Sequence, residues 1–226
     1  MRVNILIGGK AGQGINKVSE IVSRVLTGSG YYTFNYRDYP SLIRGGHNFN
    51  VLSVSDARVG SVESKLDIVV AMDDKTVELH KGELKKDGIV IMFEEFKSLG
   101  RNLNIALSGA LIKILGIDLS VLIEEIKSQF KESDEAVVAA EKGFESQEKK
   151  FDFKKLGGEI EIMHGSKAVA LGAVESDIDL YLAYPMTPAT GVMHELAARQ
   201  YDGKFMVFQP ESEVATVNAG LGASFA

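Results

Sequence analysis

The chain has 226 residues, 45% of them hydrophobic and 25% charged, so it is long enough to bury the core of one large or two modest domains. Its formal net charge of -6 disfavours nucleic acid as the main partner, because phosphate binding usually requires a basic face. The absence of cysteine excludes disulfides, thiolate catalysis and an iron–sulfur cluster held by this chain alone.

No apolar run is long enough for a signal-peptide core or a membrane span. The run nearest the start, Val3 to Ile7, is too short for either purpose. We therefore expect a cytoplasmic protein with no membrane partner.

The first stretch has the pattern of a strand, a glycine loop and a helix. Val3 to Ile7 ends in Gly8-Gly9, and apolar residues then recur at helical spacing up to Gly28. Tyr31 to Tyr36 has the composition of a second strand, which predicts an opening βαβ unit. In such a unit the loop 8–14 meets the helix N-terminus, a position that suits an anion.

The spacing of this glycine loop excludes two common nucleotide-binding motifs. A dinucleotide fingerprint starting at Gly12 requires glycine where Lys17 stands, and a P-loop requires lysine where Ile15 follows Gly14. The loop either binds an anion or is a tight turn that brings the helix close to the sheet. Spacing alone leaves both interpretations open.

The next segment, Tyr39 to His47, is irregular and contains Arg44 beside a pair of glycines. An arginine suits bidentate contact with phosphate or carboxylate, although a solvated loop arginine is the commoner outcome. Asn48 to Ser55 alternates like a strand, and residues 57–60 then have the composition of a hairpin turn.

The α/β pattern continues to about residue 145. Apolar strands are expected at Leu66 to Met72 and Ile89 to Phe93, with a polar helix from about Lys75 to Lys86 between them. Three amphipathic helices should follow, over about 105–115, 119–130 and 133–146. The charged stretch after them predicts a first domain at 1–145, a linker at 146–162 and a second domain at 163–226.

The second domain shows two strand–loop–helix patterns. Leu180 to Tyr184 leads into a helix from Ala189 to Gln200, and Phe205 to Phe208 leads into a helix from Ser212. That last helix reaches Ala226 without a cap or polar tail, which indicates the front part of a longer polypeptide. The predicted fold is thus α/β, with two three-layer units whose sheets are mostly parallel, the second incomplete.

Ligands of α/β units bind beyond the carboxyl ends of the strands, where Thr187 and Glu213 stand. These two side chains are the candidate catalytic residues. From the residues alone, Thr187 is equally a turn residue between prolines, and Glu213 a carboxylate favoured at any helix start. We expect no metal ligands, because His194-Glu195 is followed by Ala198 where a zinc-protease motif requires histidine.

Four motifs together resemble the α subunit of 2-oxoacid:ferredoxin oxidoreductases, in the version with a γ-type domain fused in front of the thiamine pyrimidine-binding domain. The first domain contributes Gly8 to Gly14 and Tyr39 to Gly46. The second contributes Tyr184-Pro185-Met186-Thr187-Pro188, similar to the family's Y-P-I-T-P, and Glu211-Ser212-Glu213, similar to its S-E block. The last two motifs, about 25 residues apart, are the most specific.

The resemblance implies an enzyme of anaerobic metabolism that oxidatively decarboxylates a 2-oxoacid, such as pyruvate or 2-oxoglutarate, to its acyl-CoA. Glu213 is then expected to hydrogen-bond the aminopyrimidine ring of thiamine diphosphate, and Thr187 to orient the substrate. Tyr184 and Pro185 would also line the cofactor site. Gly12, Gln13, Gly14 and Arg44 would cover it or contact coenzyme A.

The resemblance also implies a hetero-oligomer. A β subunit should bind the cofactor's diphosphate with Mg²⁺ and carry a [4Fe-4S] cluster, from which electrons pass to ferredoxin. A competing class is a non-catalytic module that binds coenzyme A or a nucleotide. A nicotinamide dehydrogenase is a further alternative, and the missing dinucleotide-binding fingerprint argues against it.

Overall fold

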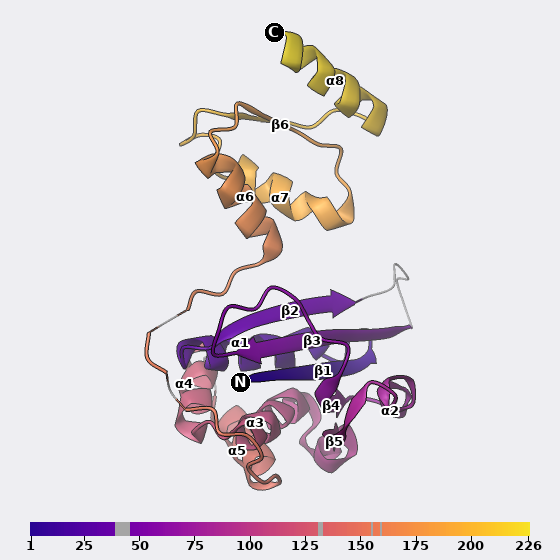
Figure 1. Ribbon diagram of the computed structural model, residues 1–226, viewed down its shortest axis with the longest axis vertical. Helices are drawn as coiled ribbons and strands as arrows, with labels where there is room; N and C mark the ends of the chain where they lie inside the picture. The colour runs from indigo at the N-terminus through magenta and orange to yellow at the C-terminus, as the bar shows by residue number, and fades with distance from the viewer. Residues whose placement is uncertain (39–45, 131–132, 155, 159) are drawn as a thin grey trace. The chain divides into compact units, whose positions relative to one another are not determined.

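The computed structural model describes residues 1–38, 46–130, 133–154, 156–158 and 160–226. By its internal contacts the chain forms two compact units, Met1–Ile162 and Met163–Ala226, which we describe separately (Figure 1). Each unit has its own sheet, of five and of two strands.

The five-stranded sheet of the first unit is mixed but mostly parallel. Its spatial order is β2-β3-β1-β4-β5, and its strands are β1 (Arg2–Lys10), β2 (Tyr32–Asp38), β3 (His47–Ser55), β4 (Leu66–Ala71) and β5 (Leu84–Met92). β1 pairs in parallel with β4, and β4 with β5, whereas β3 is antiparallel to both β1 and β2. Four strands therefore run in one direction and β3 in the other.

One predicted connection is wrong. β1, α1 and β2 form the predicted βαβ unit, with β1 and β2 running in the same direction and β3 inserted between them. β1 separates β3 from β4, however, so 57–60 is not a hairpin turn. The reason is burial: Val3 through Gly9 are all buried in β1, and a strand apolar on both faces takes a central position. Turn-forming composition cannot distinguish a hairpin from a connection that passes over another strand.

Among the described residues of the first unit, six helical segments accompany the sheet. They are α1 (Ile15–Gly28), α2 (Asp74–His80), the 3₁₀ segment η1 (Phe93–Asn102), α3 (Leu103–Leu115), α4 (Leu119–Gln129) and α5 (Asp134–Glu145). The predicted helix at 75–86 ends at His80 because Leu84 already begins β5, and η1 has no counterpart in the prediction.

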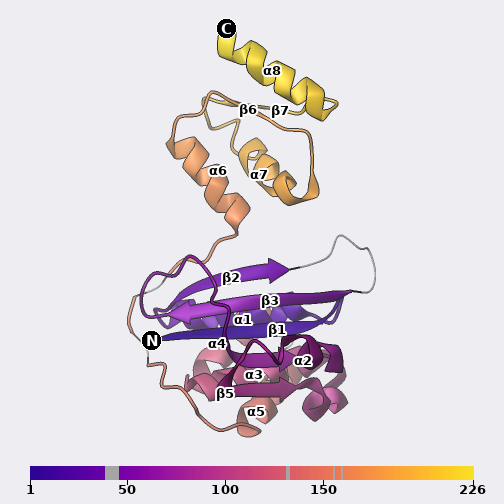
Figure 2. The ribbon, with the colours of Figure 1, turned by 45° about the vertical axis from the view of Figure 1, so that its right-hand side comes forward.

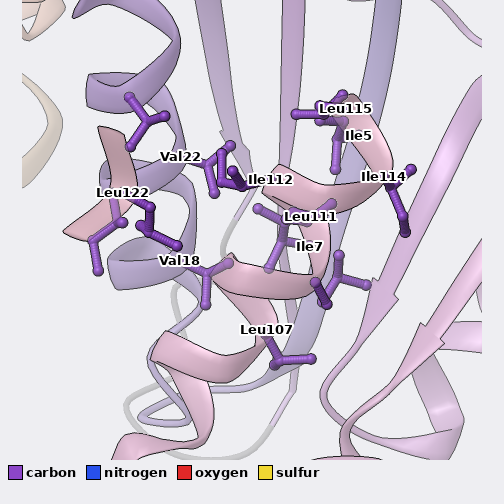
Figure 3. Close-up of a cluster of buried hydrophobic side chains, with 14 of the residues drawn as sticks. Ile5, Ile7, Val18, Val22, Leu107, Leu111, Ile112, Ile114, Leu115 and Leu122 are labelled. Carbon is purple, nitrogen blue, oxygen red and sulfur yellow. The ribbon is translucent and has the colours of Figure 1, made fainter. Parts of the chain in front are cut away.

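The main core lies between the sheet and α1, α3 and α4. Figure 3 shows Ile5 and Ile7 of β1 in one buried cluster with Val18 of α1 and Leu111 of α3. In α3, every residue from Ile105 to Leu115 except Lys113 is buried, because sheet, α1 and α5 surround it. The opposite face of the sheet carries a smaller core around Leu6, with α2 on that side.

α3 and α5 approach each other at two glycines. A Cβ on Gly143 would lie 1.9 Å from the carbonyl oxygen of Ala106, and one on Gly109 would lie 2.2 Å from that of Ala140. Both distances are shorter than any real contact, so only glycine permits this spacing.

The predicted linker, 146–162, packs on the first unit along much of its length. Phe153 is buried and lies edge-on to Tyr31, whose hydroxyl donates to the carbonyl oxygen of Lys154 at 2.7 Å. The amide of Leu156 donates to the carbonyl oxygen of Ser29 at 2.9 Å. By these contacts the segment belongs to the first unit, which ends at Ile162.

The second unit is small. It comprises α6 (Gly165–Glu175), β6 (Leu180–Leu182), α7 (Thr187–Ala197), β7 (Met206–Phe208) and α8 (Glu213–Phe225). Its core, around Ala170, Leu196 and Phe205, lies between the two-stranded sheet and α6 with α7. α8 lies on the other face, as Figure 2 shows, and contains no buried residue. Among all the described helices, none is long and apolar enough to cross a membrane.

Candidate functional site

The two loops of the second unit leave the same edge of its sheet. β6 and β7 are parallel neighbours with Leu182 opposite Phe208, and the amide of Ala183 donates to the carbonyl oxygen of Phe208 at 3.3 Å. Their carboxyl ends therefore coincide, and from there the chain enters α7 and α8. Thr187 and Glu213 are the first residues of these two helices.

Thr187 is fixed by the start of α7. The preceding carbonyl, that of Met186, accepts from the amides of Ala189 at 2.9 Å and Thr190 at 2.8 Å, so the helix begins two residues before the predicted Ala189. Pro188 in the first turn suits this start because it has no amide to satisfy. The Thr187 side chain is exposed.

Glu213 is fixed by the cap of α8. The Ser212 hydroxyl accepts from the amide of Ala215 at 3.2 Å, and the Ser212 carbonyl accepts from that of Thr216 at 3.0 Å. Glu213 follows this cap with its side chain exposed, where a carboxylate also interacts favourably with the helix dipole. Within the described part of the chain, neither its carboxylate nor the Thr187 hydroxyl has a hydrogen-bond partner.

Tyr184 and Pro185 follow β6 directly and are half-buried. The structure therefore brings Tyr184, Pro185, Thr187 and Glu213 to one edge of one small sheet. This edge offers a hydroxyl and a carboxylate that are accessible from outside the unit.

The glycine loop lies at the carboxyl end of β1 in the first unit. Gly12 and Gly14 have φ of 90° and 87°, which glycine adopts most readily. A Cβ on Gly14 would also lie 2.0 Å from Nδ2 of Asn104. The tight-turn interpretation thus has direct support, while the N-terminus of α1 receives no side-chain cap.

Gln13 uses its amide within the protein. Its Nε2 donates to the carbonyl oxygen of Met72 at 2.9 Å, and its Oε1 accepts from the amide of Lys10 at 2.6 Å. The side chain thereby ties the loop to the ends of β1 and β4. Sequence reasoning assigned Gln13 to cofactor binding and did not foresee this structural role.

Arg44 belongs to 39–45, which lies outside the described residues. Of the described residues, β2 ends at Asp38, and β3 begins at His47, which pairs with Lys10 at the end of β1. Asp38 and His47 lie at the sheet edge from which the glycine loop emerges.

A chain of three polar side chains at this edge was missed by sequence reasoning. His47 Nε2 lies 2.9 Å from His80 Nε2, and His80 Nδ1 lies 2.9 Å from Glu83 Oε2. Burial, followed by the neighbouring His80, lowers the pKa of His47. The residues come from β3, α2 and the turn after α2, so no sequence spacing indicated their contact.

Two sequence profiles match this chain, one in each unit. The profile described as "Pyruvate ferredoxin/flavodoxin oxidoreductase" matches residues 4–99. The profile described as "Pyruvate flavodoxin/ferredoxin oxidoreductase, thiamine diP-bdg" matches residues 171–226. Both units are thus similar to parts of pyruvate ferredoxin/flavodoxin oxidoreductases. The first match includes the glycine loop and Arg44, and the second includes Thr187 and Glu213.

Individual proteins of this kind are similar to the chain over nearly its whole length. A 2-oxoacid:ferredoxin oxidoreductase subunit alpha from Sulfolobus sp is 26% identical over 99% of this chain and 48% of its own length. The structure of the 2-oxoglutarate:ferredoxin oxidoreductase from Magnetococcus marinus, with 2-oxoglutarate, coenzyme A and succinyl-CoA bound, matches 99% of this chain and 46% of its own chain with a TM-score of 0.80 and 21% identity.

A third similarity covers the first unit. A keto/oxoacid ferredoxin oxidoreductase gamma subunit from Geobacter sulfurreducens PCA matches 64% of this chain and 95% of its own, with a TM-score of 0.55 and 20% identity. At such identity the structural matches establish the fold, which is the predicted α/β class. The chain spans about half the length of the Sulfolobus relative.

Proposed function

We propose that this chain is part of a thiamine diphosphate-dependent 2-oxoacid:ferredoxin oxidoreductase. The reaction converts a 2-oxoacid and coenzyme A into acyl-CoA and CO₂, and transfers two electrons to ferredoxin. One observation carries the proposal: the thiamine diphosphate-binding profile covers 171–226, the region that brings Thr187 and Glu213 to one sheet edge.

The side chains of this edge fit the pyrimidine half of the cofactor. A carboxylate is the group suited to accept a hydrogen bond from an aminopyrimidine ring, and that of Glu213 is exposed and without a described partner. The half-buried Tyr184 and Pro185 offer an apolar surface beside it. When bound, thiamine diphosphate supplies the carbanion chemistry of the decarboxylation.

Glu213 and Thr187 have different roles in the proposal. Glu213 would hold the pyrimidine ring through its carboxylate and would supply acid–base help to the chemistry of the bound cofactor. Thr187 donates its hydroxyl hydrogen to the carboxylate or keto oxygen of the substrate and thereby orients it.

Other subunits complete the enzyme in this proposal. These 226 residues contain no cysteine, so the ligands of a [4Fe-4S] cluster must lie outside them. We assign that cluster, and the site for the diphosphate and Mg²⁺, to a β subunit that transfers electrons to ferredoxin, in the cytoplasm.

The glycine loop and Arg44 enter the proposal as contacts for coenzyme A. The uncapped N-terminus of α1 and an arginine after the next strand both suit a phosphate-bearing co-substrate. In the assembled complex, Arg44→Ala should raise the KM for coenzyme A while thiamine binding stays unchanged. An unaltered KM for coenzyme A would contradict the proposed contact between Arg44 and coenzyme A.

The decisive experiment compares Glu213→Gln with Glu211→Gln in the complete complex, purified anaerobically with its partner subunits. Glu211 is an exposed carboxylate two residues away and serves as the matched control. Glu213→Gln should lower kcat by roughly 10²-fold or more, the range of general acid–base groups, and slow hydrogen–deuterium exchange at thiamine C2. Glu211→Gln should change neither.

Thr187→Val provides an internal contrast. It should raise the KM for the 2-oxoacid and leave C2 exchange intact, because it acts on the substrate and not on the cofactor. Equal C2 exchange in wild type and Glu213→Gln would contradict the assignment and leave Glu213 as a helix-start carboxylate. A purified complex without thiamine or iron would instead favour the non-catalytic binding module.

A further inference from the structure

Gln13 stands between Gly12 and Gly14, whose φ values of 90° and 87° lie in the region that glycine adopts most readily. Glycine loses more conformational freedom than other residues when it is held in one shape, so this loop needs contacts that hold it. Gln13 makes three of them. Its amide donates to the carbonyl oxygen of Lys10 at 3.2 Å, and its Oε1 accepts from the amide of Lys10 at 2.6 Å. Its Nε2 donates to the carbonyl oxygen of Met72 at 2.9 Å.

The Gln13 side chain reaches the end of β4 by passing over Gly9. A Cβ on Gly9 would lie 2.5 Å from Oε1 of Gln13 and 2.8 Å from Cβ of Met72, so a larger residue would displace the side chain. Met72 is buried, and its amide donates to the carbonyl oxygen of Gly8 at 2.8 Å. Gln13 therefore attaches the loop to a part of the chain that is itself fixed to β1.

The loop held in this way presents backbone donors that are not used within the protein. In the described part of the chain, the amides of Ala11, Gly12 and Gly14 donate to no acceptor. Ala11 and Gly12 are exposed, whereas Gln13 is half-buried. Because the Gln13 side chain already bonds to Lys10 and Met72, its influence on a bound ligand runs through the backbone that it holds.

We propose that Gln13 is the positioning residue of the glycine loop, holding the backbone amides of the loop where they contact coenzyme A without binding coenzyme A itself. This inference rests on the proposed function, in which the loop and Arg44 contact coenzyme A. Donors that are fixed before binding remove the cost of ordering the loop from the binding step. Loss of Gln13 should therefore weaken coenzyme A binding and leave the chemistry at thiamine unchanged.

The first measurement uses the full chain without coenzyme A. Gln13→Met gives a side chain of similar length without its two hydrogen-bonding groups. ¹⁵N relaxation should show the order parameters of Ala11 and Gly12 falling from about 0.85, typical of rigid backbone, to below about 0.6. Gln147→Met is the matched control, because Gln147 donates to Glu95 of η1 at 3.2 Å. It should leave the order parameters of the loop unchanged.

The second measurement uses the assembled complex. Gln13→Met should raise the KM for coenzyme A by about 2- to 10-fold, the range expected when a loop is no longer ordered before binding. The KM for the 2-oxoacid, kcat at saturating coenzyme A and hydrogen–deuterium exchange at thiamine C2 should stay as in the wild type. Gly9→Ala, which displaces the Gln13 side chain and keeps its polar groups, should raise the same KM.

Unchanged order parameters in Gln13→Met, a loosened loop with an unchanged KM for coenzyme A, or a lower thermal midpoint as the only effect would each overturn the proposal. Arg44→Ala separates this failure from that of the proposed function. If Arg44→Ala raises the KM for coenzyme A and Gln13→Met does not, coenzyme A binds at this edge but Gln13 does not position the loop for it. If neither variant changes that KM, the contact with coenzyme A is wrong, and this proposal fails with it.

Discussion

The two units present their strand ends in opposite ways. At the carboxyl edge of the first unit the polar groups engage one another: Gln13 joins β1 to β4, and His47 contacts His80. At the corresponding edge of the second unit, Thr187 and Glu213 are exposed and have no described partner. The first edge is built from internal contacts, whereas the second is open to groups from outside the unit.

The two units also differ in how much of their helices and strands is buried. β1 is buried along seven consecutive residues and α3 along nearly its whole length, while β6 and β7 have three residues each and α8 has no buried residue. Buried apolar area is the main source of folding free energy, so stability should be concentrated in the first unit. The second unit presents its candidate site residues from short elements that bury little.

The largest expected effect on stability comes from removing a buried side chain from the core of the first unit. Leu111→Ala removes a side chain that is 0% exposed and should lower the free energy of unfolding by about 2–5 kcal/mol. Its control is Leu221→Ala on α8, where the leucine is 57% exposed and the change should stay within about 0.5 kcal/mol. Denaturant unfolding followed by circular dichroism gives both values. Similar losses in the two variants would contradict the contrast between the units.

A smaller effect on stability is expected at Gly143, where α3 and α5 meet. Gly143→Ala forces a methyl group against the Ala106 carbonyl and should cost about 1–3 kcal/mol. Gly172→Ala, inside α6 with open space around the new Cβ, should instead be neutral or stabilise by up to about 1 kcal/mol. The thermal midpoints of the two variants should therefore move apart. A tolerated Gly143→Ala would show that α3 and α5 can separate without cost.

The smallest effect should appear in the pH dependence of stability. His47 has a pKa below its ordinary value of 6.5, so near that pH the unfolded chain binds more protons than the folded one. Stability is then full above the unfolded pKa and is lost as the pH falls toward the folded pKa. His47→Gln should make this acid slope shallower, whereas His194→Gln, an exposed control in the second unit, should leave it unchanged. An unaltered slope in His47→Gln would contradict the shifted pKa.

Sequence alone determined the α/β class and predicted the candidate site of the second unit. Apolar runs at strand length and apolar residues at helical spacing predict elements because burial repeats with the period of each structure. The order Tyr184-Pro185-Met186-Thr187-Pro188 and then Glu211-Ser212-Glu213 indicated the resemblance. Helix-start chemistry placed Thr187 and Glu213 at the first positions of helices that follow two parallel strands.

Tertiary structure alone decided strand order, the packing of 146–162 and the contact between His47 and His80. Strand order depends on which apolar run becomes buried on both faces, and local turn composition carries no information about that choice. Residues 146–162 are charged overall, yet a few of them, Phe153 above all, attach the segment to the first unit. His47 and His80 are 33 residues apart and meet only because β3 pairs with β1 while α2 follows β4.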